Sequence, residues 1–104
     1  MKVNYHATSS INDSFKDQIT EKMEKLDELN LRFSAADVYF KLKDGAELTS
    51  DKEFEIKICV AGQVLFSKSH SDTFEKAIPL AFSKIRKQII KYKESMEPKR
   101  GERV

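Results

Sequence analysis

Residues 53–96 read EFEIKICVAGQVLFSKSHSDTFEKAIPLAFSKIRKQIIKYKESM, and the apolar residues in this stretch change their period once. From Glu53 to Val60 apolar and polar residues alternate, which is the pattern of a strand with one buried face, and residues 64–69 are expected to form a second strand. A tight turn around Gly62 divides this part into the two strands of a hairpin. From Asp72 onward the apolar residues recur about every 3.6 residues, which predicts a helix. The stretch therefore predicts a β-β-α unit.

The predicted last helix separates an apolar face from a basic one. On a helical projection of about 100° per residue, nine apolar residues fall within one arc, and this arc is expected to pack on the sheet. Pro79 lies outside the arc, toward solvent, and should bend the helix or end an irregular first turn because it has no amide hydrogen. The residues of the apolar arc are Phe74, Ala77, Ile78, Ala81, Phe82, Ile85, Ile89, Tyr92 and Met96.

The N-terminal half predicts two further strands and one further helix. Residues 1–7 alternate and predict a first strand. Asn12 is a suitable N-cap for a helix that runs to about Glu28. Residues 36–42 alternate again and predict a second strand, which a mobile hairpin loop at residues 44–51 should follow. Four apolar residues form the stripe of the first helix: Phe15, Ile19, Met23 and Leu26.

The order β-α-β-β-β-α predicts an α+β fold, with a four-stranded, mainly antiparallel sheet and two helices on one face. A chain of 104 residues is expected to form a single domain over residues 1–96, with a charged, flexible tail at residues 97–104. No apolar run reaches the roughly 18 residues that span a bilayer, and the N-terminus lacks the apolar stretch of a signal peptide. Because Cys59 is also the sole cysteine, a cytoplasmic location is expected.

Positive charge is concentrated near the C-terminus. The formal net charge is only +2, but residues 72–104 hold nine Lys and Arg against five Asp and Glu. Between residues 76 and 93 there is no acid, and the cations there fall outside the apolar arc, so they line an exposed surface. The first helix, by contrast, interleaves Lys22 and Lys25 with acids, in the manner of ordinary ion pairs. The cations of the basic segment are Lys76, Lys84, Arg86, Lys87, Lys91 and Lys93.

Three of these cations are spaced for phosphate binding. Lys84, Lys87 and Lys91 follow one another at intervals of three and four residues, which places their ammonium groups about 5 Å apart along one ridge of a helix. Such a row matches consecutive phosphates across an RNA groove. A solvated surface without a partner is the alternative for any Lys-rich helical face.

The residues that usually carry chemistry do not form a catalytic pattern. His6 and His70 have no metal-ligand spacing and are expected to be surface histidines. Cys59 could act as a nucleophile only if folding brought one of these histidines to it. Because the three glycines are isolated, there is no phosphate-binding glycine loop. The sequence therefore predicts a protein that is not an enzyme and that has no cofactor or metal.

The element order and two segments of the last helix, residues 72–78 and 84–94, resemble the short ribosome hibernation promoting factor and ribosome-associated inhibitor family. This family is also labelled sigma-54 modulation proteins. Residues 21–26 of the first helix, EKMEKL, are similar to the family as well. The resemblance covers about residues 1–95, which is nearly the whole chain.

The resemblance implies a double-stranded-RNA-binding-domain-like fold that binds the small ribosomal subunit and its RNA in the channel for messenger and transfer RNA. Such a protein sterically blocks translation in stress or stationary phase, without chemistry. It implies no membrane, no small-molecule substrate and a monomer on the ribosome; the dimerisation domain of the long version would not fit in this length. The resemblance places five residues at basic positions of the family: Lys84, Lys87, Lys91, Lys22 and Lys25. The predicted RNA-binding set consists of these five together with Lys76, Arg86 and Lys93.

Three alternatives stay open. A transcription modulator of the sigma-54 type would act through a protein partner on an exposed sheet or helix face. A generic double-stranded-RNA-binding module would bind free duplexes as well as ribosomes. A small cytosolic enzyme would need a pocket that joins His6, His70 or Cys59.

Overall fold

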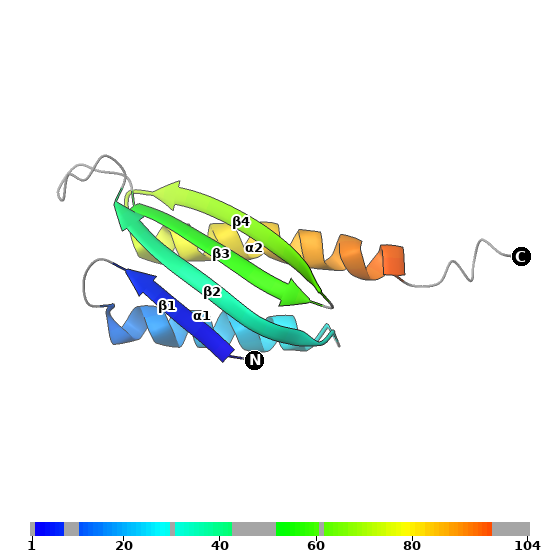
Figure 1. The fold of residues 1–104 in the computed structure, drawn as a ribbon. Coiled ribbons are helices and arrows are strands. Elements are labelled where there is room, and N and C mark those ends of the chain that lie inside the picture. Colours follow the sequence, from blue (N-terminus) through cyan, green and yellow to red (C-terminus); the bar gives the residue numbers. More distant parts are fainter. Residues whose placement is uncertain (1, 8–10, 30, 43–51, 61, 97–104) are drawn as a thin grey trace, which may run out of the picture.

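The computed structural model describes residues 2–7, 11–29, 31–42, 52–60 and 62–96, with the side chain of Met96 left out. The predicted loop at residues 44–51 and the predicted tail at residues 97–104 lie outside the described residues. The predicted order of elements is confirmed (Figure 1). The elements are β1 (Lys2–Ala7), α1 (Asp13–Asp27), β2 (Phe33–Leu42), β3 (Lys52–Val60), β4 (Gln63–Ser71) and α2 (Phe74–Met96).

The four strands form one sheet in the spatial order β1-β2-β3-β4. The β2–β3 and β3–β4 pairs are antiparallel, whereas β1 and β2 run parallel because α1 forms the crossover between them. The sheet is therefore mixed, with its single parallel pair at one edge. Strand β2 begins three residues before the predicted start at Ala36. The sequence pattern missed this start because a register shift between Phe33 and Ala35 interrupts the alternation there.

Both helices lie on the same face of the sheet (Figure 1), and the core fills the space between the two layers. Phe54 of β3 is 0% exposed, and its ring contacts those of Phe40 and Phe82 at centroid distances of 5.2 and 6.1 Å. The predicted apolar arc of α2 is confirmed, because six of its residues are buried and two pack partly buried against the core. The buried six are Ala77, Ile78, Ala81, Phe82, Ile85 and Ile89.

Side-chain hydrogen bonds fix where the two helices begin, and a glycine allows the hairpin turn. The predicted N-cap of α1 is confirmed, because Asn12 Oδ1 accepts a 2.7 Å hydrogen bond from the Ser14 amide. Thr73 Oγ1 accepts from the Lys76 amide at 3.2 Å, so α2 starts at Phe74. Gly62, in the β3–β4 turn, has a φ of 82°, which is in the left-handed region that favours glycine.

Pro79 lies inside α2, which continues through it from Phe74 to Met96. The expectation that Pro79 ends an irregular first turn is wrong, because it lies beyond that turn. It lies outside the buried arc, as expected, and is half-buried where it lines a groove beside α1. A proline leaves the carbonyl four residues before it without a helical partner, and here that carbonyl belongs to Glu75. Gln18 Nε2 of α1 donates to this oxygen at 3.2 Å. A side chain of one helix thus replaces a missing hydrogen bond of the other.

We expect Gln18→Ala to lower the free energy of unfolding by about 1 kcal/mol, because the Glu75 carbonyl loses its protein donor. In a Pro79→Ala background the amide of residue 79 can bond to Glu75, so the same substitution should cost less than half as much. Urea denaturation of the four chains of this double-mutant cycle measures the coupling. Equal costs in both backgrounds would show that Gln18 and Pro79 are independent.

Candidate nucleic-acid interface

A groove of about 470 Å³ runs between α1 and α2. Its floor is apolar, because Leu26 and Phe82 are only 2% and 4% exposed. Lys22 and Lys25 come from one turn of α1, and Arg86 comes from the flank of α2 that faces this turn. The groove opens away from the sheet, since Pro79 and Arg86 lie outside the buried arc of α2. Its lining residues are Lys22, Lys25, Leu26, Glu28, Pro79, Phe82, Ser83 and Arg86.

The three cations of the groove are not neutralised by direct contacts. Within the described ranges, Lys22, Lys25 and Arg86 form no ion pair and no side-chain hydrogen bond. The expectation that the acids of α1 pair with Lys22 and Lys25 is therefore wrong. Exposed ion pairs stabilise a helix by little, so their absence costs little; Lys25 is exposed and Lys22 is half-buried at the groove. Glu28 is the one acid among the residues lining the groove.

The structure places Lys84, Lys87 and Lys91 on the other flank of α2, next to β4. Lys84 Nζ donates to the backbone oxygen of Lys68 at 3.1 Å. Lys91 lines a hollow together with Gln63 of β4, and Lys87 is exposed. The predicted set is thus divided into two basic surfaces on opposite sides of α2. We call Lys22, Lys25 and Arg86 the groove cations, and Lys84, Lys87 and Lys91 the ridge cations.

Besides Lys84, two further predicted cations are engaged within the protein. Lys76 pairs with Asp72 at 3.3 Å, an acid that lies just before the acid-free segment. The Ser71 hydroxyl and then Lys76 hold the pKa of Asp72 below its ordinary value by hydrogen bonding. Lys93 Nζ donates to the backbone oxygen of Leu29 at 2.8 Å, which ties α2 to the end of α1. Both ammonium groups are less available to a ligand than the groove cations are.

The strand register keeps the histidines away from Cys59. His6 pairs with Tyr39, which pairs with Glu55, so His6 lies four residues along the sheet from Cys59, or about 13 Å. His70 pairs with Glu53, which is still farther along β3. The condition for a nucleophilic Cys59 is therefore not met by either histidine.

No group of three His, Cys, Asp or Glu side chains in the described part of the chain is placed to hold a metal ion. Neither of the two helices described here is long and apolar enough to cross a membrane.

The sheet face opposite the helices carries a polar network that sequence patterns did not reveal. Lys41 Nζ lies 2.9 Å from Glu55 Oε1, and this contact raises the pKa of Lys41. His6 Nε2 lies 3.0 Å from Asp37 Oδ1 and holds the pKa of that carboxyl below its ordinary value. The His6 ring also stacks on Tyr39 at a centroid distance of 4.5 Å. Alternation placed these residues on one face, but it could not show which of them pair across strands.

Two solved structures share this fold. A ribosomal subunit interface protein from Coxiella burnetii aligns with a TM-score of 0.74 at 17% identity, covering 90% of this chain and 99% of that one. The N-terminal domain of Thermus thermophilus Protein Y aligns with a TM-score of 0.70 at 18% identity, covering 88% and 94%. At these identities the two structures establish a shared fold.

The chain belongs to the family described as sigma 54 modulation protein / S30EA ribosomal protein, whose model matches residues 2–97. This match confirms the family that the sequence resembles. No curated protein matches the chain by sequence.

Proposed function

We propose that this protein is a ribosome-associated translation inhibitor that binds the small subunit in the channel for messenger and transfer RNA. The observation that carries the proposal is the groove between α1 and α2, into which two helices bring three cations without acidic partners. The family and the similar ribosomal subunit interface protein support a ribosomal site. This function places the protein in the cytosol, because ribosomes work there.

The groove cations bind RNA phosphates in this proposal. Arg86 offers a planar fork that can hold two phosphate oxygens, and Lys22 and Lys25 act as point charges from the opposite wall. The ridge cations contact a second stretch of RNA backbone on the other side of α2. These contacts are independent of base sequence and weaken with salt.

In this proposal the protein inhibits translation by occupying the channel, and no chemical reaction is required. Residues 2–96 act as one ribosome-binding domain and a monomer on the ribosome, with residues 97–104 as a tail. The packed sheet and helices exclude messenger and transfer RNA from the channel during stress or stationary phase. The proposal therefore assigns no catalytic residue, cofactor, membrane or small-molecule substrate.

Sedimentation with purified small subunits through a sucrose gradient tests this function. The chain should migrate with the subunit at about 50 mM salt, leave it as salt rises, and inhibit translation of a reporter messenger RNA in a purified system. A tenfold mass excess of free RNA duplex should not displace it.

Displacement by the duplex would favour the generic double-stranded-RNA-binding module. A folded chain that stays at the top of the gradient but is recovered with polymerase components would favour the transcription modulator. Either result would contradict the proposal.

A further inference from the structure

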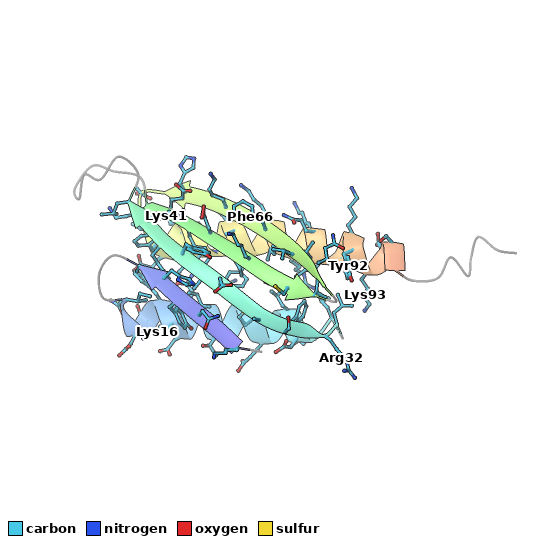
Figure 2. The ribbon with its side chains drawn as sticks, in the orientation of Figure 1. Lys16, Arg32, Lys41, Phe66, Tyr92 and Lys93 are labelled. Atoms are coloured by element: carbon cyan, nitrogen blue, oxygen red, sulfur yellow. The ribbon has the colours of Figure 1, made fainter. Side chains whose placement is uncertain are left out.

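The sheet face opposite the helices is uncovered, and Figure 2 views the molecule from this side. Three aromatic side chains lie on it, each from a different strand: His6 from β1, Tyr39 from β2 and Phe66 from β4. Phe66 is 41% exposed, although a large apolar ring on a strand is normally covered. His6 covers part of Tyr39 and is itself exposed. This face, which we call the open face, thus presents two accessible rings.

The described residues of the open face carry a small excess of positive charge, with the lysines Lys2, Lys41, Lys57 and Lys68 against the carboxylates Asp37, Glu53 and Glu55. Its three described carboxylates are occupied by contacts within the face: Glu55 with Lys41, Glu53 with Lys68, and Asp37 with Asn4 and His6. Lys57 forms no ion pair among the residues described here, although it lies opposite the Asp37 carboxylate in the β2–β3 register. On its other side it lies directly opposite Phe66 in the β3–β4 register. Its Nζ is 5.3 Å from the centre of the Tyr39 ring. The Lys57 ammonium therefore lies between the exposed Phe66 ring of β4 and the stacked His6 and Tyr39 rings of β1 and β2.

The outer edge of β4 is closed to an added strand. Gln88 Nε2 donates to the Phe66 backbone oxygen at 2.6 Å, and Lys84 Nζ donates to the Lys68 backbone oxygen at 3.1 Å. These oxygens are the acceptors that a peptide would need to extend the sheet. A partner that binds beside Phe66 is therefore expected to dock on the face of the sheet and contact side chains. The side chains offered are rings interleaved with amines, which suit bases and phosphates.

The spacing of the rings also suits an unpaired chain. Phe66 and His6 lie three interstrand spacings apart across the sheet and two residues apart along it, or about 16 Å in all, which an extended stretch of two or three nucleotides covers. A duplex keeps its bases stacked inside, so it cannot place them on the rings.

We propose that the open face binds single-stranded RNA, with one base stacked on Phe66, the adjoining phosphate on Lys57, and a further base stacked on His6 above Tyr39. This site is separate from the groove, and it does not depend on the groove being the ribosomal contact.

Fluorescence titration of a single-stranded 12-nucleotide RNA that carries 2-aminopurine tests the site, because this base analogue is quenched when it stacks on a ring. Phe66→Leu keeps an apolar side chain but removes the ring, and we expect it to weaken binding about tenfold and to abolish most of the quenching. Lys57→Gln should weaken binding several-fold and reduce its salt dependence. Val64→Leu, a change at a 56% exposed neighbour on the same strand, is the matched control and should alter neither quantity.

Absence of quenching by the native chain, or equal quenching by Phe66→Leu, would overturn the proposal. A second pair of results would also overturn it: Phe66→Leu keeps ribosome binding, whereas Phe66→Ser loses it. That pair would indicate that Phe66 makes an apolar contact with a protein. To separate the two sites, the variant Lys22→Glu/Lys25→Glu/Arg86→Glu is sedimented with small subunits, because it changes the groove and leaves the open face unchanged. If the native chain quenches the oligonucleotide but does not sediment with ribosomes, the open-face site stands and the proposed ribosomal function fails.

Discussion

A chain carrying Lys22→Glu, Lys25→Glu and Arg86→Glu is expected to lose at least about a hundredfold in affinity for the small ribosomal subunit. Hydrogen bonds to charged groups contribute about 1.5 to 3 kcal/mol each, so three lost phosphate contacts exceed the 2.7 kcal/mol or so that a hundredfold change requires. Reversal of charge adds repulsion from the phosphates. The variant should fold normally, because none of the three side chains has a partner among the described residues. Sedimentation and circular dichroism measure the two properties.

The matched control changes the net charge equally at positions that do not line the groove. Lys2→Glu, Lys16→Glu and Arg32→Glu replace one residue of β1, one near the start of α1 and one just before β2; Figure 2 labels the last two. This control should lose much less affinity, since it alters only the long-range field. Equal losses in the two triple variants would mean that overall charge, and not the groove, determines binding.

Phe54→Ala is expected to lower the free energy of unfolding by about 3 to 5 kcal/mol. Phe54 is fully buried, in the central strand β3, and its ring joins Phe40 of β2 to Phe82 of α2. Removing it leaves a cavity between the sheet and the helix, which cannot close without moving both layers. Urea denaturation should therefore show a midpoint shifted strongly downward with little change in slope.

Leu80→Ala provides the comparison for that prediction. Leu80 belongs to the same fold but is 50% exposed on α2, so its loss should change the free energy of unfolding by less than about 1 kcal/mol. A similar cost for Phe54→Ala would show that the interface between sheet and helix is loosely packed.

The fold could be predicted because the hydrophobic period is clear in most elements. Alternation in β3 and the 3.6-residue period in α2 indicate which apolar side chains are buried, and the structure buries them. The pattern is not decisive in β4, where Val64 and Phe66 are exposed and Ser67 and Ser69 are buried. The start of β2 was missed because the register shift near Phe33 breaks the alternation. The parallel pairing of β1 follows from the crossover through α1, which is a property of the connection and not of the strand sequence.

The candidate site was only partly predictable. Helical spacing shows which face of α2 Arg86 occupies, but it does not show that this flank faces Lys22 and Lys25 across a groove. Lys93 belongs to the same charged run, yet its amine ties the helices together through the Leu29 oxygen. Contacts between elements far apart in sequence decide which cations are free, and local patterns carry no information about them.

Directed hydroxyl-radical probing from the groove tests the central claim most directly. An iron chelate attached to Ser83→Cys, in a chain whose native thiol is removed by Cys59→Ser, would place the radical source among the groove residues. Sedimentation first verifies that the labelled chain still binds. The account predicts strong cleavage of small-subunit RNA along the messenger and transfer RNA channel, and weak cleavage from a chelate at Thr20→Cys on the exposed side of α1. Strong cleavage from Thr20→Cys with none from Ser83→Cys would contradict the assignment of the groove as the RNA contact.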